Sequence, residues 1–134
     1  MEQPLHLIIL TPYGRYFEGN VSFLNVRSED YDLGIYPGHA PLISTVAISK
    51  MIIRNGDKEY LYAVGGGIIN IDKEKVTLVL NSIERADEID LNRALEAKKR
   101  AEERLSQHSE EIDIARAQAS LARALQRINI KQGK

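Results

Sequence analysis

The residues best suited to chemistry in this 134-residue chain are six arginines towards its C-terminal end. They form two triplets, and within each triplet the successive spacings are seven and four residues. Residues at these spacings share one face of an α-helix, so each triplet can present its guanidinium groups on one side. The guanidinium fork matches the oxygens of phosphate, which makes phosphate binding the chemistry that this pattern favours. The triplets are Arg93, Arg100 and Arg104, followed by Arg116, Arg123 and Arg127.

Two antiparallel helices would bring these triplets together. In such a pair, the residue numbers of two facing positions have a nearly constant sum. That sum is 220 both for Arg93 with Arg127 and for Arg104 with Arg116. That sum places the turn near residue 110 and gathers several positive charges at one edge of the pair. A polyanion that relieves their repulsion would favour the closed pair, because a ligand shifts an equilibrium by its differential affinity for the two states.

The part of the chain before residue 85 differs in composition from the part after it. Eight of the nine glycines and all four prolines lie before that point, which predicts many short strands and turns. The sequence Asn55-Gly56-Asp57 is a strong hairpin signal, and the polar run 72–75 marks a second turn. Turn signals recur about every ten residues, so this part is predicted to form a sandwich or barrel with about eight strands.

From Asp87 onward the apolar residues follow a helical period, with a polar break at 106–109 that suits a short turn. The sequence therefore predicts two antiparallel helices. Their seam is rich in alanine, which lets the backbones approach closely but buries little area at about 25 cal/mol per Å². We infer that such a hairpin could open. The predicted stripes are Leu91, Ala94, Ala97 or Lys98, Ala101 and Leu105 in the first helix, and Ile114, Gln118, Leu121, Leu125 and Ile128 in the second, with Ala115, Ala119 and Ala122 nearby.

Charge and composition exclude several classes of function. The formal net charge is -1, so no global field attracts nucleic acid. The chain has no cysteine and only three scattered histidines, which argues against a metal centre. Residues 1–4 lack the basic patch and apolar stretch expected of a signal peptide, and the apolar runs are far shorter than the roughly 18 residues that a membrane span requires. The chain is therefore expected to be cytoplasmic and to meet a membrane only through a partner.

Several alternatives remain open from the residues alone. The arginines could lie on ordinary solvated helices with ion pairs, such as Glu96 with Arg100. A hydrolase would need an acid/base group such as His39 with Asp30 or Asp32, but no nucleophile elbow is present. A free-standing ATP sensor or adaptor is also compatible with the pattern. The glycines at 65–67 lack the Lys-Ser/Thr of a P-loop and are better interpreted as a close-packed strand.

Three motifs resemble the epsilon subunits of bacterial F-type ATP synthases. The segment 31–42, YDLGIYPGHAPL, looks like the signature loop of that family, and 62–69, YAVGGGII, resembles its glycine cluster. The opening 7–12, LIILTP, is also similar. The resemblance covers essentially the whole chain. It implies an α+β protein, with an antiparallel β-sandwich in the form of a flattened barrel of about ten strands over 1–85 and a regulatory two-helix hairpin over 86–134.

The resemblance also implies a role and a set of partners. Members of the family are non-catalytic rotor subunits whose sandwich binds the gamma subunit and the c-ring, with Asp32 at the family's acidic interface position. His39 could be an interface residue or a residue that shapes the turn. Their helices either fold against the sandwich or extend into the alpha/beta catalytic head and block ATP hydrolysis. The implied location is peripheral, on the cytoplasmic face of the plasma membrane. The glycines and prolines of 31–42 could equally serve only to shape a turn.

The segment 89–94, IDLNRA, matches a motif found in the ATP-binding members of the family. The match implies that ATP is a regulatory ligand of the folded hairpin, with no cofactor required. In those relatives the motif contacts adenine and ribose, and arginines of both helices hold the phosphates. The matching residues here are Glu84, Asp90, Arg93, Ala94, Arg100, Arg123 and Arg127.

Overall fold

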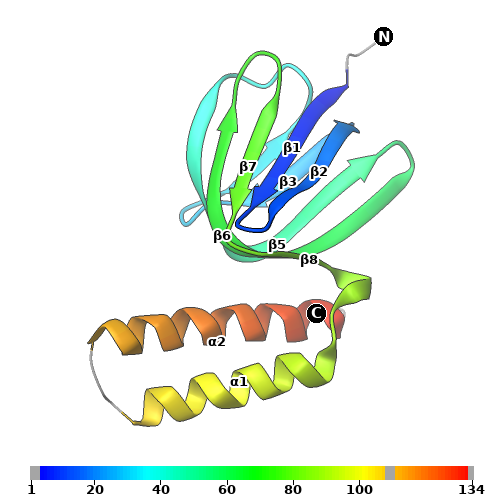
Figure 1. Ribbon diagram of the computed structural model, residues 1–134. Helices are drawn as coiled ribbons and strands as arrows, with labels where there is room; N and C mark the ends of the chain where they lie inside the picture. The colour runs from blue at the N-terminus through cyan, green and yellow to red at the C-terminus, as the bar shows by residue number, and fades with distance from the viewer. Residues whose placement is uncertain (1–3, 108–110, 133–134) are drawn as a thin grey trace.

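The structure is a computed structural model that describes residues 4–107 and 111–132. An eight-stranded sheet precedes two helices, and a short 3-10 turn joins the two parts (Figure 1). The elements, in chain order, are β1 (Leu5–Thr11), β2 (Gly14–Val21), β3 (Phe23–Arg27), β4 (Asp32–Ile35), β5 (Leu42–Asn55), β6 (Lys58–Ile71), β7 (Val76–Leu80), β8 (Ile83–Arg85), η1 (Ala86–Glu88), α1 (Leu91–Ser106) and α2 (Glu111–Lys131).

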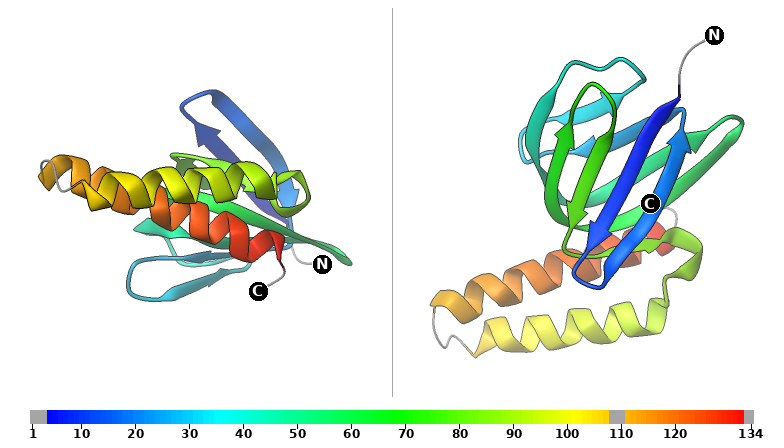
Figure 2. Two further views of the ribbon diagram at one scale, coloured as in Figure 1. Left: turned by 90° about the horizontal axis from the view of Figure 1, so that it is seen from below. Right: turned by 45° about the horizontal axis from the view of Figure 1, so that its top comes forward.

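The strands form one sheet that folds over on itself, in the order β2-β1-β7-β6-β5-β3-β4, with β8 paired to β6. All pairs are antiparallel except β1 with β7. β5 and β6 are each 14 residues long and run through both layers of the sandwich (Figures 1 and 2). β6 bends at Gly66, where a φ of 88° suits glycine.

The strand count corrects the figure of ten that the resemblance implied. β5 and β6 each continue from one layer into the other without a break, and counting their two halves separately would give ten. Among the described residues the sheet is also not closed into a barrel, because β2 and β4 are its two edges. The antiparallel sandwich itself is confirmed.

Both predicted turns are present. Asn55 pairs with Lys58 across the β5–β6 hairpin, and Gly56 adopts a φ of 63°. Between β6 and β7, the Asp72 carboxylate accepts hydrogen bonds from the N–H groups of Glu74 at 2.8 Å and Lys75 at 2.9 Å. These bonds lower the pKa of Asp72, because they favour its charged form.

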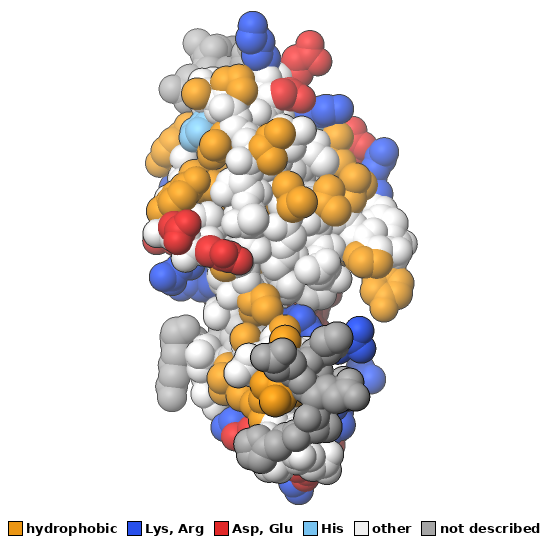
Figure 3. All heavy atoms as spheres, turned by 90° about the vertical axis from the view of Figure 1, so that its left-hand side faces the viewer, with side chains coloured by type: hydrophobic (Ala, Val, Ile, Leu, Met, Phe, Trp, Pro, Cys, Tyr) orange, Lys and Arg blue, Asp and Glu red, His pale blue; other side chains and the backbone are white. Residues whose placement is uncertain are grey.

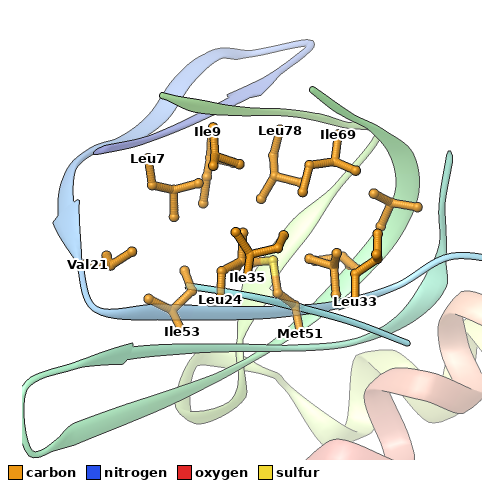
Figure 4. Close-up of a cluster of buried hydrophobic side chains, with 14 of the residues drawn as sticks. Leu7, Ile9, Val21, Leu24, Leu33, Ile35, Met51, Ile53, Ile69 and Leu78 are labelled. Carbon is orange, nitrogen blue, oxygen red and sulfur yellow. The ribbon is translucent and has the colours of Figure 1, made fainter. Parts of the chain in front are cut away.

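The core lies between the two layers and consists mainly of branched aliphatic side chains, with Met51 and Tyr62 (Figure 4). Burial alternates along β1 and β7, so that every second residue points inward. Figure 4 shows Leu7, Ile9, Leu78 and Ile69 in one layer, facing Leu24, Ile35 and Met51 in the other. All seven of these side chains have an exposed fraction of 0%.

The helices pack through alanine, as the sequence predicts. Ala94 and Ala101 of α1, with Ala117 and Ala124 of α2, are each at most 2% exposed. The stripe predicted for the second helix is partly wrong, because Gln118 and Leu125 are exposed while Ala117 and Ala124 are buried, a rotation of about 100° around the helix. The predicted turn falls on 106–109, of which 108 and 109 lie outside the described residues.

The second helix lies between the first helix and the sandwich (Figures 1 and 2). Its C-terminal end packs on β6 in a small apolar cluster of Ala63, Ile89 and Ile130, with Leu61 and Ala86 at the side. This cluster is separate from the core inside the sandwich. Neither described helix has the length and apolar character to cross a membrane.

Candidate functional site

A pocket of about 520 Å³ lies where the two helices meet the sandwich. Strands β6 and β8 form one wall, and α1 and α2 form the others. Four arginines line it, one pair from each helix. The lining residues are Ala63, Val64, Gly65, Ser82, Ile83, Glu84, Glu88, Ala97, Arg100, Ala101, Arg104, Ser120, Arg123, Ala124, Gln126 and Arg127.

The helical period accounts for the position of the four guanidinium groups. Arg100 and Arg104 are one turn apart on α1, and Arg123 and Arg127 are one turn apart on α2, so each pair lies on one face. The alanines beside them are small enough for the helices to approach closely. Two pairs of positive side chains therefore share one space, which is the arrangement expected of a polyanion site.

Glu84 of β8 is bound by one of these arginines. Arg127 donates from Nε to Glu84 Oε1 at 2.6 Å and from Nη2 to Oε2 at 3.3 Å. The two side chains are 26% and 30% exposed, so water screens the pair only in part. This bidentate pair ties α2 to the last strand of the sandwich.

The rim of the pocket beside η1 carries more acidic groups. Glu88 lines the pocket, and its carboxylate lies 3.5 Å from the guanidinium of Arg85, which also binds Asp87 at 2.7 Å. The hydrogen bond from Arg85 lowers the pKa of the Asp87 carboxyl. Burial, together with the nearby Glu88 charge, raises the pKa of Tyr16. Four arginines nevertheless outnumber the two carboxylates of the lining, so the pocket favours anions.

The pocket contains four of the seven residues that the sequence suggested for ATP: Glu84, Arg100, Arg123 and Arg127. The other three lie elsewhere. The Asp90 side chain is the N-cap of α1 and accepts the Arg93 N–H at 3.2 Å. Arg93 is exposed, and Ala94 is 0% exposed in the seam. The lining on α1 begins at Ala97, beyond the first turn of the helix.

Sequence reasoning missed several residues of the pocket. Arg104 belongs to the first arginine triplet but is absent from the residues matched to ATP, although its one-turn spacing from Arg100 places it in the same pocket. Gly65, Ser82 and Gln126 carry no local signal, since their positions depend on how α2 packs on β6. The described residues hold no group of three or more histidines, aspartates or glutamates arranged for a metal ion.

The two predicted interface residues lie at the start of β4 and after its end. Asp32 is the first residue of this strand, with a carboxylate oxygen 4.0 Å from Arg27 Nε. It lines a second hollow of about 610 Å³, which α2 borders through Gln126 and Asn129. His39 follows the strand in a turn, where its ring N–H donates to the Ala40 carbonyl at 2.7 Å.

The outer face of the sandwich carries exposed apolar side chains across three neighbouring strands. Ile43 of β5 is 72% exposed, Ile68 of β6 is 51% exposed and Val79 of β7 is 50% exposed. Ile68 pairs directly with Val79, and Thr45 is the partner of Ile68 on β5. Figure 3 shows hydrophobic side chains gathered on the sandwich half of the molecule. Exposed clusters of this kind commonly mark a protein interface.

Comparison with known proteins matches both halves of the chain to one family. Residues 4–86 match the β-sandwich domain of the ATP synthase delta/epsilon chain, and residues 87–132 match its long α-helix domain. An ATP synthase epsilon chain of Nitratidesulfovibrio vulgaris is 39% identical over 131 residues, 98% of each chain. That of Bacillus velezensis is 38% identical over 122 residues, which is 91% of this chain and 92% of the relative.

Solved structures support the fold. A chain in the mitochondrial ATP synthase of Euglena gracilis aligns with a TM-score of 0.75 at 18% identity, covering 89% of this chain and 76% of that one. A chain in the central stalk and c-ring structure of Tetrahymena thermophila aligns with a TM-score of 0.65 at 12% identity, covering 97% and 98%. With both family matches and the bacterial relatives, this chain belongs to the ATP synthase delta/epsilon chain family, among the epsilon subunits of F-type ATP synthases.

Proposed function

We propose that this chain is a non-catalytic regulatory subunit of the rotor, and that ATP bound in the four-arginine pocket favours the docked hairpin. In the undocked state the helices would extend into the alpha/beta head and inhibit ATP hydrolysis. The observation that carries the proposal is the composition of the pocket, since its walls come from α1, α2 and the sandwich. A polyanion held by all three walls binds only the docked state and must therefore stabilise it.

The way α2 rests on the sandwich supports a hairpin that can detach. Gln126 lines both the arginine pocket and the second hollow beside Asp32, so α2 has an open space on each side. Among the described residues, the buried apolar cluster that joins α2 to β6 is small and consists of Ala63, Ile89 and Ile130. A narrow contact of this kind costs less to separate than a continuous core, because the free energy scales with buried apolar area.

ATP titration of the isolated chain by calorimetry tests the ligand. Arg123→Ala removes a guanidinium from the pocket and should weaken ATP binding by about tenfold or more, in line with the loss of a hydrogen bond to a charged group. Arg116→Ala is the matched control, since Arg116 is an exposed arginine of the same helix that lies outside the pocket and should have a smaller effect. No heat from ATP with the wild-type chain would refute the ligand assignment.

Removal of residues 87–134 tests the inhibition. We expect the remaining sandwich to fold and to assemble into the complex, and ATP hydrolysis by that complex to rise. The described residues of the removed segment contribute nothing to the sandwich core, which is the reason to expect folding. Unchanged or lower hydrolysis would contradict the regulatory role.

The partners follow from the same assignment. We propose that the apolar face at Ile43, Ile68 and Val79 binds the gamma subunit, and that Asp32 and His39 contribute to contacts with the c-ring. The chain would then be peripheral on the cytoplasmic face of the plasma membrane, attached through the c-ring. Ile68→Glu should prevent co-purification with gamma, whereas Lys58→Glu, at an exposed polar position at the other end of the same strand, should have less effect.

A further inference from the structure

The sandwich wall of the pocket contains a hydroxyl that no sequence motif indicated. Ser82 lies between β7 and β8 and lines the pocket beside Gly65 of β6. The two residues are held together by a hydrogen bond from the Gly65 N–H to the Ser82 carbonyl at 2.8 Å. The backbone of Ser82 is therefore held by the sheet rather than by a helix.

A side chain at position 65 would close this part of the pocket. A Cβ there would collide with Ser82 Oγ and lie 3.2 Å from both Ser82 Cβ and Arg123 Cδ. The Ser82 hydroxyl therefore occupies the space that a side chain at residue 65 would fill, and the Arg123 side chain borders it. The backbone of Gly65 does not have positive φ, so its lack of a side chain matters here for space alone.

Some of the other polar groups of the pocket are paired with one another. Among the described residues, its side-chain hydrogen bonds join Arg127 to Glu84, and Arg123 Nη2 to Ser120 Oγ at 3.2 Å. The Ser82 hydroxyl takes part in neither bond. A hydroxyl that faces a pocket next to a guanidinium can donate to an oxyanion that the guanidinium also binds.

We propose that Ser82 is a ligand-binding residue that donates its hydroxyl proton to a phosphate oxygen held by Arg123, and that Gly65 is the positioning residue that leaves room for both. This inference rests on the proposed ATP site. The phosphate would then have one contact from the sandwich, through Ser82, and one from α2, through Arg123, so that the ligand bridges the two parts directly. Undocking of α2 would separate Arg123 from Ser82 and break that bridge.

Calorimetry on the full chain with ATP, and separately with tripolyphosphate, tests the contact. Ser82→Ala should lower the affinity for both ligands by a similar factor of about ten, because the lost hydrogen bond is to phosphate. Ser44→Ala, which removes a hydroxyl elsewhere on the sandwich, is the control and should leave both affinities unchanged. Wild-type affinity in Ser82→Ala would overturn this inference alone, whereas no binding by the wild-type chain would overturn it together with the proposed ATP site.

The double variant tests the role of Gly65. Gly65→Ala should lower the ATP affinity at least as much as Ser82→Ala does, since the added methyl group displaces the Ser82 hydroxyl and crowds Arg123. When the hydroxyl is already absent, the additional loss caused by Gly65→Ala should shrink, because part of its effect acts through Ser82. If the fold-loss of ATP affinity in the double variant equals the product of the two single-variant losses, Gly65 acts independently of Ser82 and the positioning role is overturned.

Discussion

The sandwich buries leucine, isoleucine, valine and methionine between two layers, whereas the seam between the helices buries four alanines. A fully buried leucine or isoleucine contributes about 1.5–3 kcal/mol, and an alanine methyl contributes about 0.8 kcal/mol. The first part therefore has the core of an independent fold. The second part depends on close backbone approach and on a few polar contacts, which makes it the part whose position a ligand can control.

The largest expected effect comes from a cavity in the sandwich core. Leu78→Ala removes a side chain that is 0% exposed and should lower the free energy of unfolding by about 3 kcal/mol. Val79→Ala on the same strand is the control. Because Val79 is 50% exposed, this variant should lower the free energy of unfolding much less. Urea unfolding measures both. Equal losses would mean that the two faces of β7 do not differ as the structure indicates.

The next effect tests the seam. Ala124→Leu places a large side chain where the exposed fraction is 2%, and should destabilise the docked hairpin by about 1–3 kcal/mol through overpacking. Ala122→Leu is its match on the exposed face of α2 and should be close to neutral. Hydrogen exchange should show loss of protection in the helices while the sandwich remains protected. Simultaneous loss in both parts would contradict their independence.

The ion pair between the parts should have a smaller effect. Arg127→Gln breaks the bidentate contact with Glu84 and should weaken docking by about 1–2 kcal/mol, because the pair is only partly screened. Arg54→Gln removes a comparable contact to Glu59 at 3.0 Å, but those side chains are 44% and 53% exposed. Hydrogen exchange of α2 should therefore increase in the first variant and stay near wild type in the second.

The sequence predicted the sandwich well because its signals are local. The Asn-Gly turn and the polar run at Asp72 each determine a hairpin through contacts within a few residues, and both are present. The open sheet edges were not predictable in this way. They depend on how far β5 and β6 continue through both layers, which is a property of the whole sheet.

The candidate site was predictable only in part, for the same reason. The arginine spacing predicted which residues share a helix face, and Arg100, Arg123 and Arg127 do line one pocket. Which part of each helix faces the sandwich depends on long-range packing against β6. That packing leaves Arg93 outside the pocket and brings Ser82 into it.

The role of Asp90 can be separated into capping and ligand binding. Asp90→Ala removes the N-cap of α1 and should cost about 1 kcal/mol of helix stability, detected as a loss of helical circular dichroism on heating. Asp90→Ser keeps a capping oxygen and should restore that stability. A serine variant with a normal helix and weakened ATP affinity would show that the carboxylate also contacts the ligand.

The smallest effect concerns the Asp72 turn, far along the sheet from the helices. The N–H groups of Glu74 and then Lys75 hold the pKa of Asp72 below its ordinary value of 3.8. Its contribution to stability is therefore complete above that value and is lost as the pH falls through the lower folded-state pKa. At neutral pH, Asp72→Asn should lower the melting temperature by ~2 °C, and this difference should vanish in strong acid. A difference that persists at low pH would mean that charge at Asp72 does not stabilise the turn, whereas the melting of the helices should be the same in both proteins throughout.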